Sequence, residues 1–264
     1  MTRNELRGIL RSAPLIASVQ ADPGTSLATP ETIVRLATAS LETGARVLRL
    51  QGLENIRAVR EAYPEVPIIG LIKADYPGSQ VYITPTMAEI HALIETGCQV
   101  IALDVTARPR PGGVKREDLI LTAQAAGRLV MADIDTPENA NAARSFGCDL
   151  ISTTLAGYTN DRARSVGPDL DLLVEITRQS GDALLIAEGR LETGGDVALA
   201  RTLGADAVVI GGALNDPRKN TARLARAAAP RAERVGCIDL GGTWLRFGVL
   251  TAGEWEIPDR AQIA

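Results

Sequence analysis

The sequence predicts a single (β/α)8 barrel of the α/β class, followed by a short C-terminal tail like a β-hairpin. Its 264 residues suit one large α/β domain, since barrels of this kind run to about 250 residues. Eight aliphatic runs alternate with amphipathic segments along the chain. Each run is almost continuously apolar, which is typical of parallel strands that are covered on both faces. Eightfold βα alternation favours a closed barrel.

The predicted strands share an aliphatic core and lie at 15–21, 46–51, 67–73, 99–105, 128–134, 150–155, 183–189 and 206–212. The predicted helices follow them, at 30–43, 53–62, 86–96, 116–127, 137–146, 168–180, 193–203 and 218–229. Helix starts are indicated by Thr29-Pro30, Thr136-Pro137 and Gly167-Pro168. Helix ends are indicated by Gly44, Gly97, Gly147 and Gly204. A doubly wound sheet is the alternative, but no G-x-G-x-x-G follows the first strand.

The composition argues against several kinds of partner. The net charge is −4 and no dense run of Lys or Arg occurs, so we expect neither nucleic acid nor an anionic membrane as a partner. Three dispersed cysteines and one histidine leave little material for a metal centre, and we expect none. The N-terminus does not resemble a signal peptide, and the cysteines are expected to be reduced thiols. The sequence therefore predicts a cytoplasmic protein.

Polar residues stand at the carboxyl ends of nearly all predicted strands, where barrels of this class carry their chemistry. The set comprises Gln20, Arg49, Lys73, Asp104, Asp133, Thr153, Thr154 and Glu188. Lys73 is predicted to be an acid/base group or a substrate clamp, rather than a lysine that only reaches solvent. Glu188 is predicted to be functional, and an ion pair with an arginine is compatible with that role. Asp104 and Asp133 either take part in the site or cap the loops that follow them.

Glycines after the last two predicted strands indicate a phosphate site. Gly189, Gly211 and Gly212 lie where barrels commonly bind a phosphate with backbone N–H groups and a short helix. Glycine also serves in ordinary turns, so the location of these residues carries the prediction.

Two segments after the third and fourth predicted strands are candidates to border the site. Residues 74–86 form a long loop, which either contacts a polyol through residues such as Tyr82 or is a plain hairpin that turns at Pro77-Gly78. Residues 107–113 are basic and rich in proline and glycine. They either cover the site or pair with surface acids.

Several motifs together resemble one family. The runs IASVQA, IGLIKADYPGSQVYITPT, IALDVTARPRP, MADI, STTLAGYT, IAEGR and VVIGGA occur in order at the predicted strands, between about residues 14 and 229. They are similar to motifs of the N-acetylmannosamine-6-phosphate 2-epimerases. The resemblance implies a TIM barrel that interconverts N-acetylmannosamine 6-phosphate and N-acetylglucosamine 6-phosphate in sialic acid catabolism. It also implies an isomerase that acts without a redox cofactor and commonly forms a homodimer.

The resemblance assigns roles residue by residue. Lys73 matches the family's lysine after the third strand, and Glu188 matches the glutamate of its AEGR motif, which implies that both are catalytic. The substrate-binding positions that it implies are Gln20, Arg49, Asp133, Gly189, Arg190, Gly211 and Gly212. One departure concerns a T-R-P triplet of the relatives, where this chain has Asn215-Asp216-Pro217. An aspartate thus replaces the expected arginine, and Arg218 is a candidate substitute.

The tail resembles a different family. CIDLGGTWLRFGVL is similar to the phosphate-binding hairpin that opens sugar kinases of the ROK family, such as N-acetylmannosamine kinase. Two strand-like runs flank Gly241-Gly242-Thr243, which predicts a hairpin. We expect a boundary near Pro230, with the barrel over 1–230 and a truncated kinase-like segment over 231–264. That segment lacks the second lobe and the catalytic aspartate of a kinase.

Inverting C2 of an N-acetyl amino sugar removes a proton from carbon and returns it on the opposite face. That needs one acid/base group on each face, or one group with a relay through the substrate. Lys73 and Glu188, from the third and seventh predicted strands, are expected to face each other across the opening. Two other functions stay open: a phosphosugar aldolase with Lys73 as a Schiff base, and a non-catalytic or decayed sugar-phosphate-binding protein.

Overall fold

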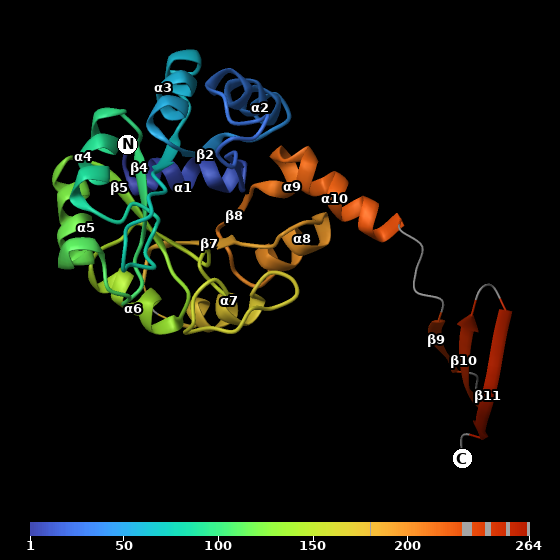
Figure 1. Cartoon of the computed structure of the whole chain (residues 1–264). Coiled ribbons are helices and arrows are strands. Elements are labelled where there is room, and N and C mark those ends of the chain that lie inside the picture. The colour runs from blue at the N-terminus through green and yellow to red at the C-terminus, as the bar shows by residue number, and fades with distance from the viewer. Residues whose placement is uncertain (180, 229–233, 241–243, 252–253, 263–264) are drawn as a thin grey trace. The chain divides into compact units, whose positions relative to one another are not determined.

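The computed structural model describes residues 1–179, 181–228, 234–240, 244–251 and 254–262. The chain divides into two compact units, Met1–Pro217 and Arg218–Ala264. The first unit holds a closed barrel of eight parallel strands in the order β1 to β8 (Figure 1). Its strands are β1 (Leu15–Val19), β2 (Val47–Gln51), β3 (Ile68–Leu71), β4 (Val100–Asp104), β5 (Leu129–Asp133), β6 (Leu150–Ser152), β7 (Leu184–Glu188) and β8 (Ala207–Ile210). The predicted fold class is confirmed.

Helices follow the strands and surround the barrel (Figure 1). They are α2 (Pro30–Glu42), α3 (Leu53–Ala62), α4 (Met87–Glu95), α5 (Arg116–Ala125), α6 (Pro137–Ser145), α7 (Leu170–Thr177), α8 (Gly194–Thr202) and the short α9 (Gly212–Asn215), with a 3-10 turn, η1, at Pro111–Gly113. The predicted caps Thr29 and Thr136 each accept a backbone N–H with the side chain. α7 instead begins at Leu170, because Asp169 accepts the N–H of Leu172 at 2.9 Å. Within the described residues, no helix combines the length and apolarity needed to cross a membrane.

An N-terminal helix, α1 (Arg3–Ser12), precedes the barrel and was not predicted. Its signal in the sequence is a capping box, in which Thr2 and Glu5 exchange hydrogen bonds, followed by apolar residues at a helical spacing of four. Leu6 and Leu10 are buried in the same apolar cluster as the inward residues of the strands. Arg3 pairs with Asp149 at 2.9 Å, just before β6 begins. α1 therefore covers the amino ends of the strands.

Alternate residues of each strand point to opposite faces of the sheet. The outward apolar residues pack with those of the helices in one cluster. The inward ones form a second cluster of Ile16, Val47, Ile69, Leu71, Val100, Ala102, Leu129, Met131, Leu150, Leu184, Ile186, Ala207 and Val209. The barrel interior is therefore apolar from the amino ends of the strands to their middle.

The second unit contains nearly all of α10 (Pro217–Ala228) and a three-stranded antiparallel sheet. Its strands are β9 (Arg234–Leu240), β10 (Trp244–Thr251) and β11 (Glu254–Gln262), in the order β11-β10-β9. β9 and β10 contain the two strand-like runs of the predicted hairpin, and β11 was not predicted. The predicted turn, Gly241-Gly242-Thr243, and the boundary at Pro230 lie outside the described residues.

Candidate active site

Every second residue of each strand points into the barrel. These inward positions are apolar along most of each strand and become mostly polar at the carboxyl ends of the strands. Two residues beyond the last inward apolar side chain, each strand reaches Ser18, Arg49, Lys73, Asp104, Asp133, Ser152, Glu188 or Gly211. We call the seven polar residues the inward polar set, and Gly211 takes the corresponding place after β8. The sequence alone did not single out Ser18 and Ser152. Their signal is the strand parity, which becomes visible only once the inner face of each strand is known.

Arg49 joins two carboxylates of this set. Its Nη2 donates to Asp133 Oδ2 at 2.5 Å, and its Nη1 donates to Glu188 Oε1. The side chain of Arg49 is 3% exposed and that of Asp133 is 0% exposed, whereas Glu188 retains 12%. Three residues from β2, β5 and β7, all predicted from the sequence, thus form one buried charge network with a single positive charge.

Two hydroxyl groups, one at the end of β6 and one just after it, complete the network. Thr154 Oγ1 lies 2.6 Å from Asp133 Oδ1 and 2.9 Å from Glu188 Oε2. Ser152 Oγ lies 3.2 Å from the same Glu188 oxygen. Thr153 points the other way, because its hydroxyl donates to the Glu188 carbonyl and accepts the Glu188 backbone N–H. Of the two adjacent threonines, only Thr154 therefore belongs to the charge network.

Burial has a strong effect on the electrostatics of this network. Loss of solvent, with a further contribution from the negative charge of Glu188, raises the pKa of Asp133 to about 7 despite the nearby Arg49. Burial and the negative charge of Asp133 also raise the pKa of Tyr82. Tyr82 packs against the inward apolar cluster, so the 74–86 loop brings an aromatic side chain to this end of the barrel.

Lys73 lies two residues beyond β3, in phase with the inward residues Ile69 and Leu71. It is exposed at this end and forms an isolated antiparallel bridge with Ile83. The 74–86 loop therefore leaves and rejoins the sheet as a hairpin excursion, one of its two predicted forms. The backbone N–H of Asp104 donates to the carbonyl of Ile83 at 3.1 Å, which inserts this segment beside β4.

A second group of predicted residues meets where β1 and β8 adjoin. Gln20 donates from Nε2 to Ser18 Oγ at 2.8 Å. A Cβ on Gly211 would lie 3.5 Å from Ser18 Cβ, so the residue that follows β8 lies next to Ser18 of β1. Asn215 of α9 donates to the Ser18 carbonyl at 3.1 Å. The structure thus brings Gln20 and the Gly211-Gly212 turn together around Ser18, which is paired with Arg49 in the β1–β2 register.

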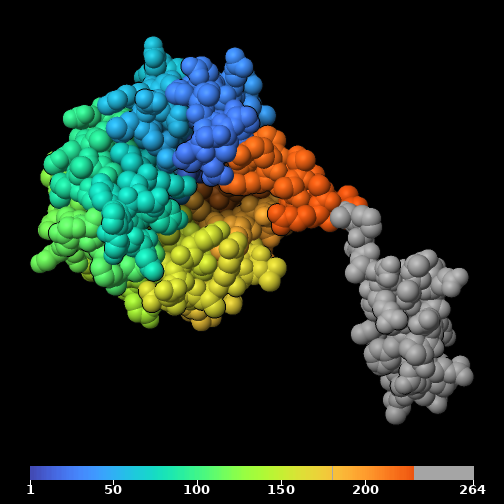
Figure 2. Space-filling view, in the orientation of Figure 1, coloured from blue at the N-terminus to red at the C-terminus, as the bar shows by residue number. Residues whose placement is uncertain are grey.

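Arg190 follows β7 in the sequence, and its side chain contacts the segment that follows β6. Its guanidinium donates to the carbonyls of Ala156 and Gly167 and to Ser165 Oγ, each at 2.8 Å, and it stacks on Tyr158. These contacts hold residues 154–167 against the end of β7. Gly189 and Arg190 both have positive φ, of 102° and 58°, which turns the backbone sharply after Glu188. Figure 2 shows the yellow surface of this segment beside the teal loop that follows β3.

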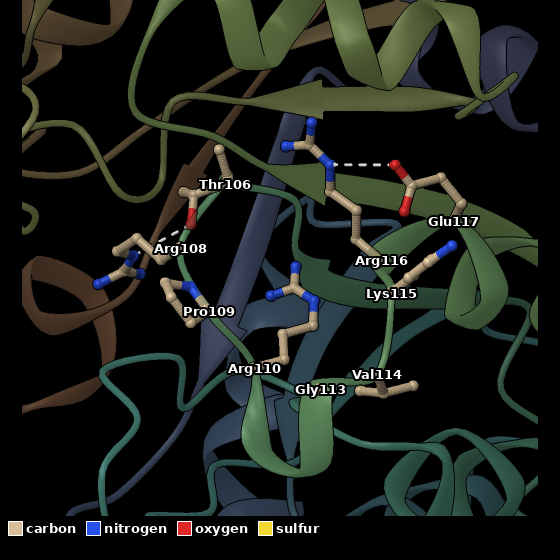
Figure 3. A pocket seen from close by; sticks show the side chains of 10 residues that line it. Thr106, Arg108, Pro109, Arg110, Gly113, Val114, Lys115, Arg116 and Glu117 are labelled. Atoms are coloured by element: carbon tan, nitrogen blue, oxygen red, sulfur yellow. Dashed lines mark hydrogen bonds and ion pairs between the residues drawn. The ribbon is translucent and has the colours of Figure 1, made fainter.

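Asp104, the inward residue of β4, belongs to a different cluster. Arg108 donates to its Oδ2 at 2.5 Å, and Arg110 donates to its carbonyl and lies 3.8 Å from Oδ1. The loop around these residues borders an open pocket of about 340 Å³, which is lined in part by Arg108, Arg110, Lys115 and Arg116 (Figure 3). Asp104 thus anchors the basic 107–113 segment, and that segment contacts the 74–86 loop through a Ser79 hydroxyl bond to the Pro109 carbonyl.

Asp216, which stands where relatives are expected to have arginine, is 3% exposed. Its backbone N–H donates to the Gly212 carbonyl at 3.2 Å and ends α9. The position therefore holds a buried acid at the end of the first unit. Arg218 belongs to the second unit.

A closed (β/α)8 barrel with a buried charge network at the carboxyl ends of its strands is the architecture of TIM-barrel enzymes. Among the residues that the structure describes, no group of three or more His, Cys, Asp or Glu side chains is arranged to hold a metal ion. The chain belongs to the N-acetylmannosamine-6-phosphate epimerase family. The family model, described as "Putative N-acetylmannosamine-6-phosphate epimerase", matches residues 33–229.

Individual relatives agree with this assignment. A protein of Yersinia pseudotuberculosis is 44% identical over 211 residues, which cover 80% of this chain and 88% of the relative. One of Corynebacterium glutamicum is 42% identical over 214 residues, which cover 80% and 91%. Both are named "Putative N-acetylmannosamine-6-phosphate 2-epimerase". The structure of the N-acetylmannosamine-6-phosphate 2-epimerase from Clostridium perfringens matches with a TM-score of 0.81 and 38% identity, over 84% of this chain and 96% of that one.

Proposed function

We propose that this chain is an isomerase that inverts C2 of N-acetylmannosamine 6-phosphate to give N-acetylglucosamine 6-phosphate. The observation that carries the proposal is the buried network of Arg49, Asp133 and Glu188 at the carboxyl end of the barrel. It occurs in a chain whose relatives are named for this reaction. The proposed substrate is a phosphorylated N-acetyl amino sugar, and no redox cofactor is required by the proton transfers.

Lys73 and Glu188 are proposed as the acid/base pair. β3 and β7 are four strands apart in a closed barrel of eight, so they lie on opposite sides of its opening. A sugar between them meets one group on each face, as inversion at C2 requires. The C2 proton is acidic when C1 is a carbonyl, and its removal places negative charge on the C1 oxygen. Arg49 is proposed to hold Glu188 in position and to favour this charge electrostatically.

The phosphate is proposed to bind at the β1–β8 junction, near Gln20 and the Gly211-Gly212 turn. Binding the phosphate away from the reacting carbon supplies energy for positioning C2 between Lys73 and Glu188. Gly189 and Arg190 are proposed to shape the same end of the site, since they set the path of the chain after β7 and hold residues 154–167.

Exchange of solvent deuterium into C2 tests the proposal directly. With N-acetylmannosamine 6-phosphate in D2O, the wild-type chain should form the 2-epimer with deuterium at C2. Lys73→Ala and Glu188→Ala should each lose about 10²-fold or more of this activity. Lys115→Ala and Glu61→Ala remove exposed charges of the same types and should leave the rate unchanged. Wild-type rates in either site variant would refute that residue's role.

The same experiment separates the rival functions. An aldolase with a Lys73 Schiff base would form a covalent adduct that borohydride traps. A sugar-phosphate-binding protein without activity would bind the substrate but exchange no deuterium at C2. A homodimer and the kinase-like character of residues 231–264 stay predictions. Sedimentation tests the first, and nucleotide binding tests the second.

A further inference from the structure

Thr154 Oγ1 is surrounded by three oxygen atoms. Asp133 Oδ1 lies at 2.6 Å, Ser152 Oγ at 2.8 Å and Glu188 Oε2 at 2.9 Å. A hydroxyl group has one proton to donate and two lone pairs that accept. Thr154 can therefore donate to only one of these neighbours at a time. Because an ionised carboxylate only accepts, the distances carry information about where the protons are.

Counting protons shows that two ionised carboxylates do not suit this geometry. The hydroxyls of Thr154 and Ser152 bring two protons to four oxygen–oxygen contacts, including the 3.2 Å contact from Ser152 to Glu188. If Thr154 donates to Asp133, its contact with Glu188 has no proton, and two electron-rich oxygens face each other at 2.9 Å. One additional proton on either carboxyl group removes this conflict, because that group then donates to Thr154.

The charges of Arg49, Asp133 and Glu188 also indicate one additional proton in the network. Arg49 contributes one positive charge to two carboxylates, and Asp133 is fully buried. A single proton shared by Asp133 and Glu188 makes the network neutral, which lowers the cost of its burial.

We infer that Thr154 is a positioning residue that relays a proton between Asp133 and Glu188. The protonated carboxyl of Asp133 breaks its O–H bond and passes the proton to Thr154 Oγ1. Thr154 at the same time passes its own proton to Glu188 Oε2. Thr154 ends with one hydrogen as before, Asp133 becomes ionised and Glu188 becomes neutral, and no other reactant is consumed. The reverse transfer follows the same path.

This inference rests on the proposed epimerase function, because the relay resets Glu188 after a turnover. An epimerase that removes a proton with one group and returns one with another ends each turnover with both groups in altered protonation states. Glu188 then needs a proton donor or acceptor before the next turnover. Asp133, whose side chain is 0% exposed, serves as that partner from inside the network. The exposed Lys73 then returns its proton to solvent, and Glu188, which is 12% exposed, takes one up and passes it back through Thr154, so that Asp133 is reprotonated.

Two variants of Thr154 and one matched control test the relay. Thr154→Val removes the hydroxyl at nearly constant volume and should lower kcat by about 10- to 100-fold, with KM changed by less than about twofold. Thr154→Ser keeps a hydroxyl and should retain most of kcat. Thr159→Val is the control, because the Thr159 hydroxyl also binds a buried aspartate, Asp135 at 2.7 Å, but lies outside the network. Thr159→Val should leave the pH profile of kcat unchanged, whereas Thr154→Val should shift that profile.

A measurement without substrate separates failure of the relay from failure of the proposed function. In the free protein with 13C-labelled Asp, the carboxyl resonance of Asp133 should titrate with a midpoint near pH 7. Thr154→Val should move that midpoint by about one pH unit, a tenfold change in proton affinity. An unchanged midpoint, or equal loss of kcat in Thr154→Ser and Thr154→Val, would overturn the inference. Absence of C2 exchange in the wild-type chain, with the midpoint shift intact, would refute only the epimerase function.

Discussion

Two clusters of arginine and carboxylate groups lie at the carboxyl end of the barrel, and their charge ratios are opposite. At β4, two arginines surround one carboxylate, since Arg108 and Arg110 both approach Asp104. Across β2, β5 and β7, one arginine serves two carboxylates. In the first cluster the carboxylate is saturated with donors from the loop that it holds. In the second, one carboxylate can keep a proton. Asp104 is therefore a structural anchor, whereas the pair of Asp133 and Glu188 is able to exchange a proton.

The largest expected difference between the clusters is in catalysis. Glu188→Gln keeps the shape of the side chain but removes a proton-accepting group, so kcat should fall by about 10²- to 10⁴-fold. Its melting temperature should not fall, because Arg49 still pairs with Asp133. Asp104→Asn should lower the melting temperature and reduce kcat by less than about tenfold. Deuterium exchange at C2 and thermal unfolding measure both. An equal loss of kcat in the two variants would remove the distinction.

The next effect concerns stability. Arg49→Met leaves two buried carboxylates without their cation and should reduce the free energy of unfolding by about 3–5 kcal/mol. Adding Asp133→Asn to Arg49→Met should restore part of the lost free energy of unfolding, since only one buried carboxylate then remains. Arg108→Met should reduce the free energy of unfolding by only about 1–3 kcal/mol, because Arg110 still lies near Asp104. Urea unfolding gives these values. A double variant that is less stable than Arg49→Met would contradict the proposed charge balance.

The Arg49 network should also make the stability of the protein depend on pH. Burial raises the pKa of Asp133 from 3.8 to about 7, so the folded protein binds this proton more tightly than the unfolded chain does. The resulting stability is fully present below about pH 4 and is lost as the pH rises through about 7. The free energy of unfolding should therefore fall between about pH 5 and about pH 8 by more in the wild-type chain than in Asp133→Asn. Equal slopes for the two proteins would show that Asp133 does not hold the proton.

The smallest expected effect lies at the contact between the β4 cluster and the site. Ser79→Ala removes the hydroxyl that donates to the Pro109 carbonyl and accepts the Val81 N–H. The free energy of unfolding should fall by about 0.5–1.5 kcal/mol. KM should rise more than kcat falls, because the 74–86 loop carries Tyr82 and leads back to Ile83 beside Lys73. A steady-state comparison with the wild type measures this. A fall in kcat with KM unchanged would argue against a role for this loop in binding.

The sequence predicted the strands and most of the inward polar set, because a charged residue at the end of an aliphatic run marks the place where a buried strand leaves the barrel core. The apolar pattern alone did not distinguish Asp104 from Asp133, since both end similar apolar runs, and only the family resemblance singled out Asp133. Their difference depends on contacts with Arg49 and Arg108, which lie 84 and 4 residues away from their respective partners.

The sequence also did not show which of Thr153 and Thr154 contacts the charge network. Both faces of a parallel strand in a barrel are buried, so hydrophobic periodicity does not reveal which face is the inner one. Lys73 was predicted to end a strand, whereas β3 ends at Leu71 and the return of Ile83 to the sheet fixes the backbone at Lys73. Such tertiary contacts leave no local trace in the sequence.

α1 closes the amino end of the barrel, where Leu6 and Leu10 join the inward apolar cluster. Together with the aliphatic layers above it, this helix leaves no passage through the barrel within the described part of the chain. Substrate must then enter and product must leave through the same opening, between the loops that follow β3, β4 and β6. Traffic in both directions is therefore subject to the same loops, and a substitution that stiffens them would slow the release of product as well as the entry of substrate.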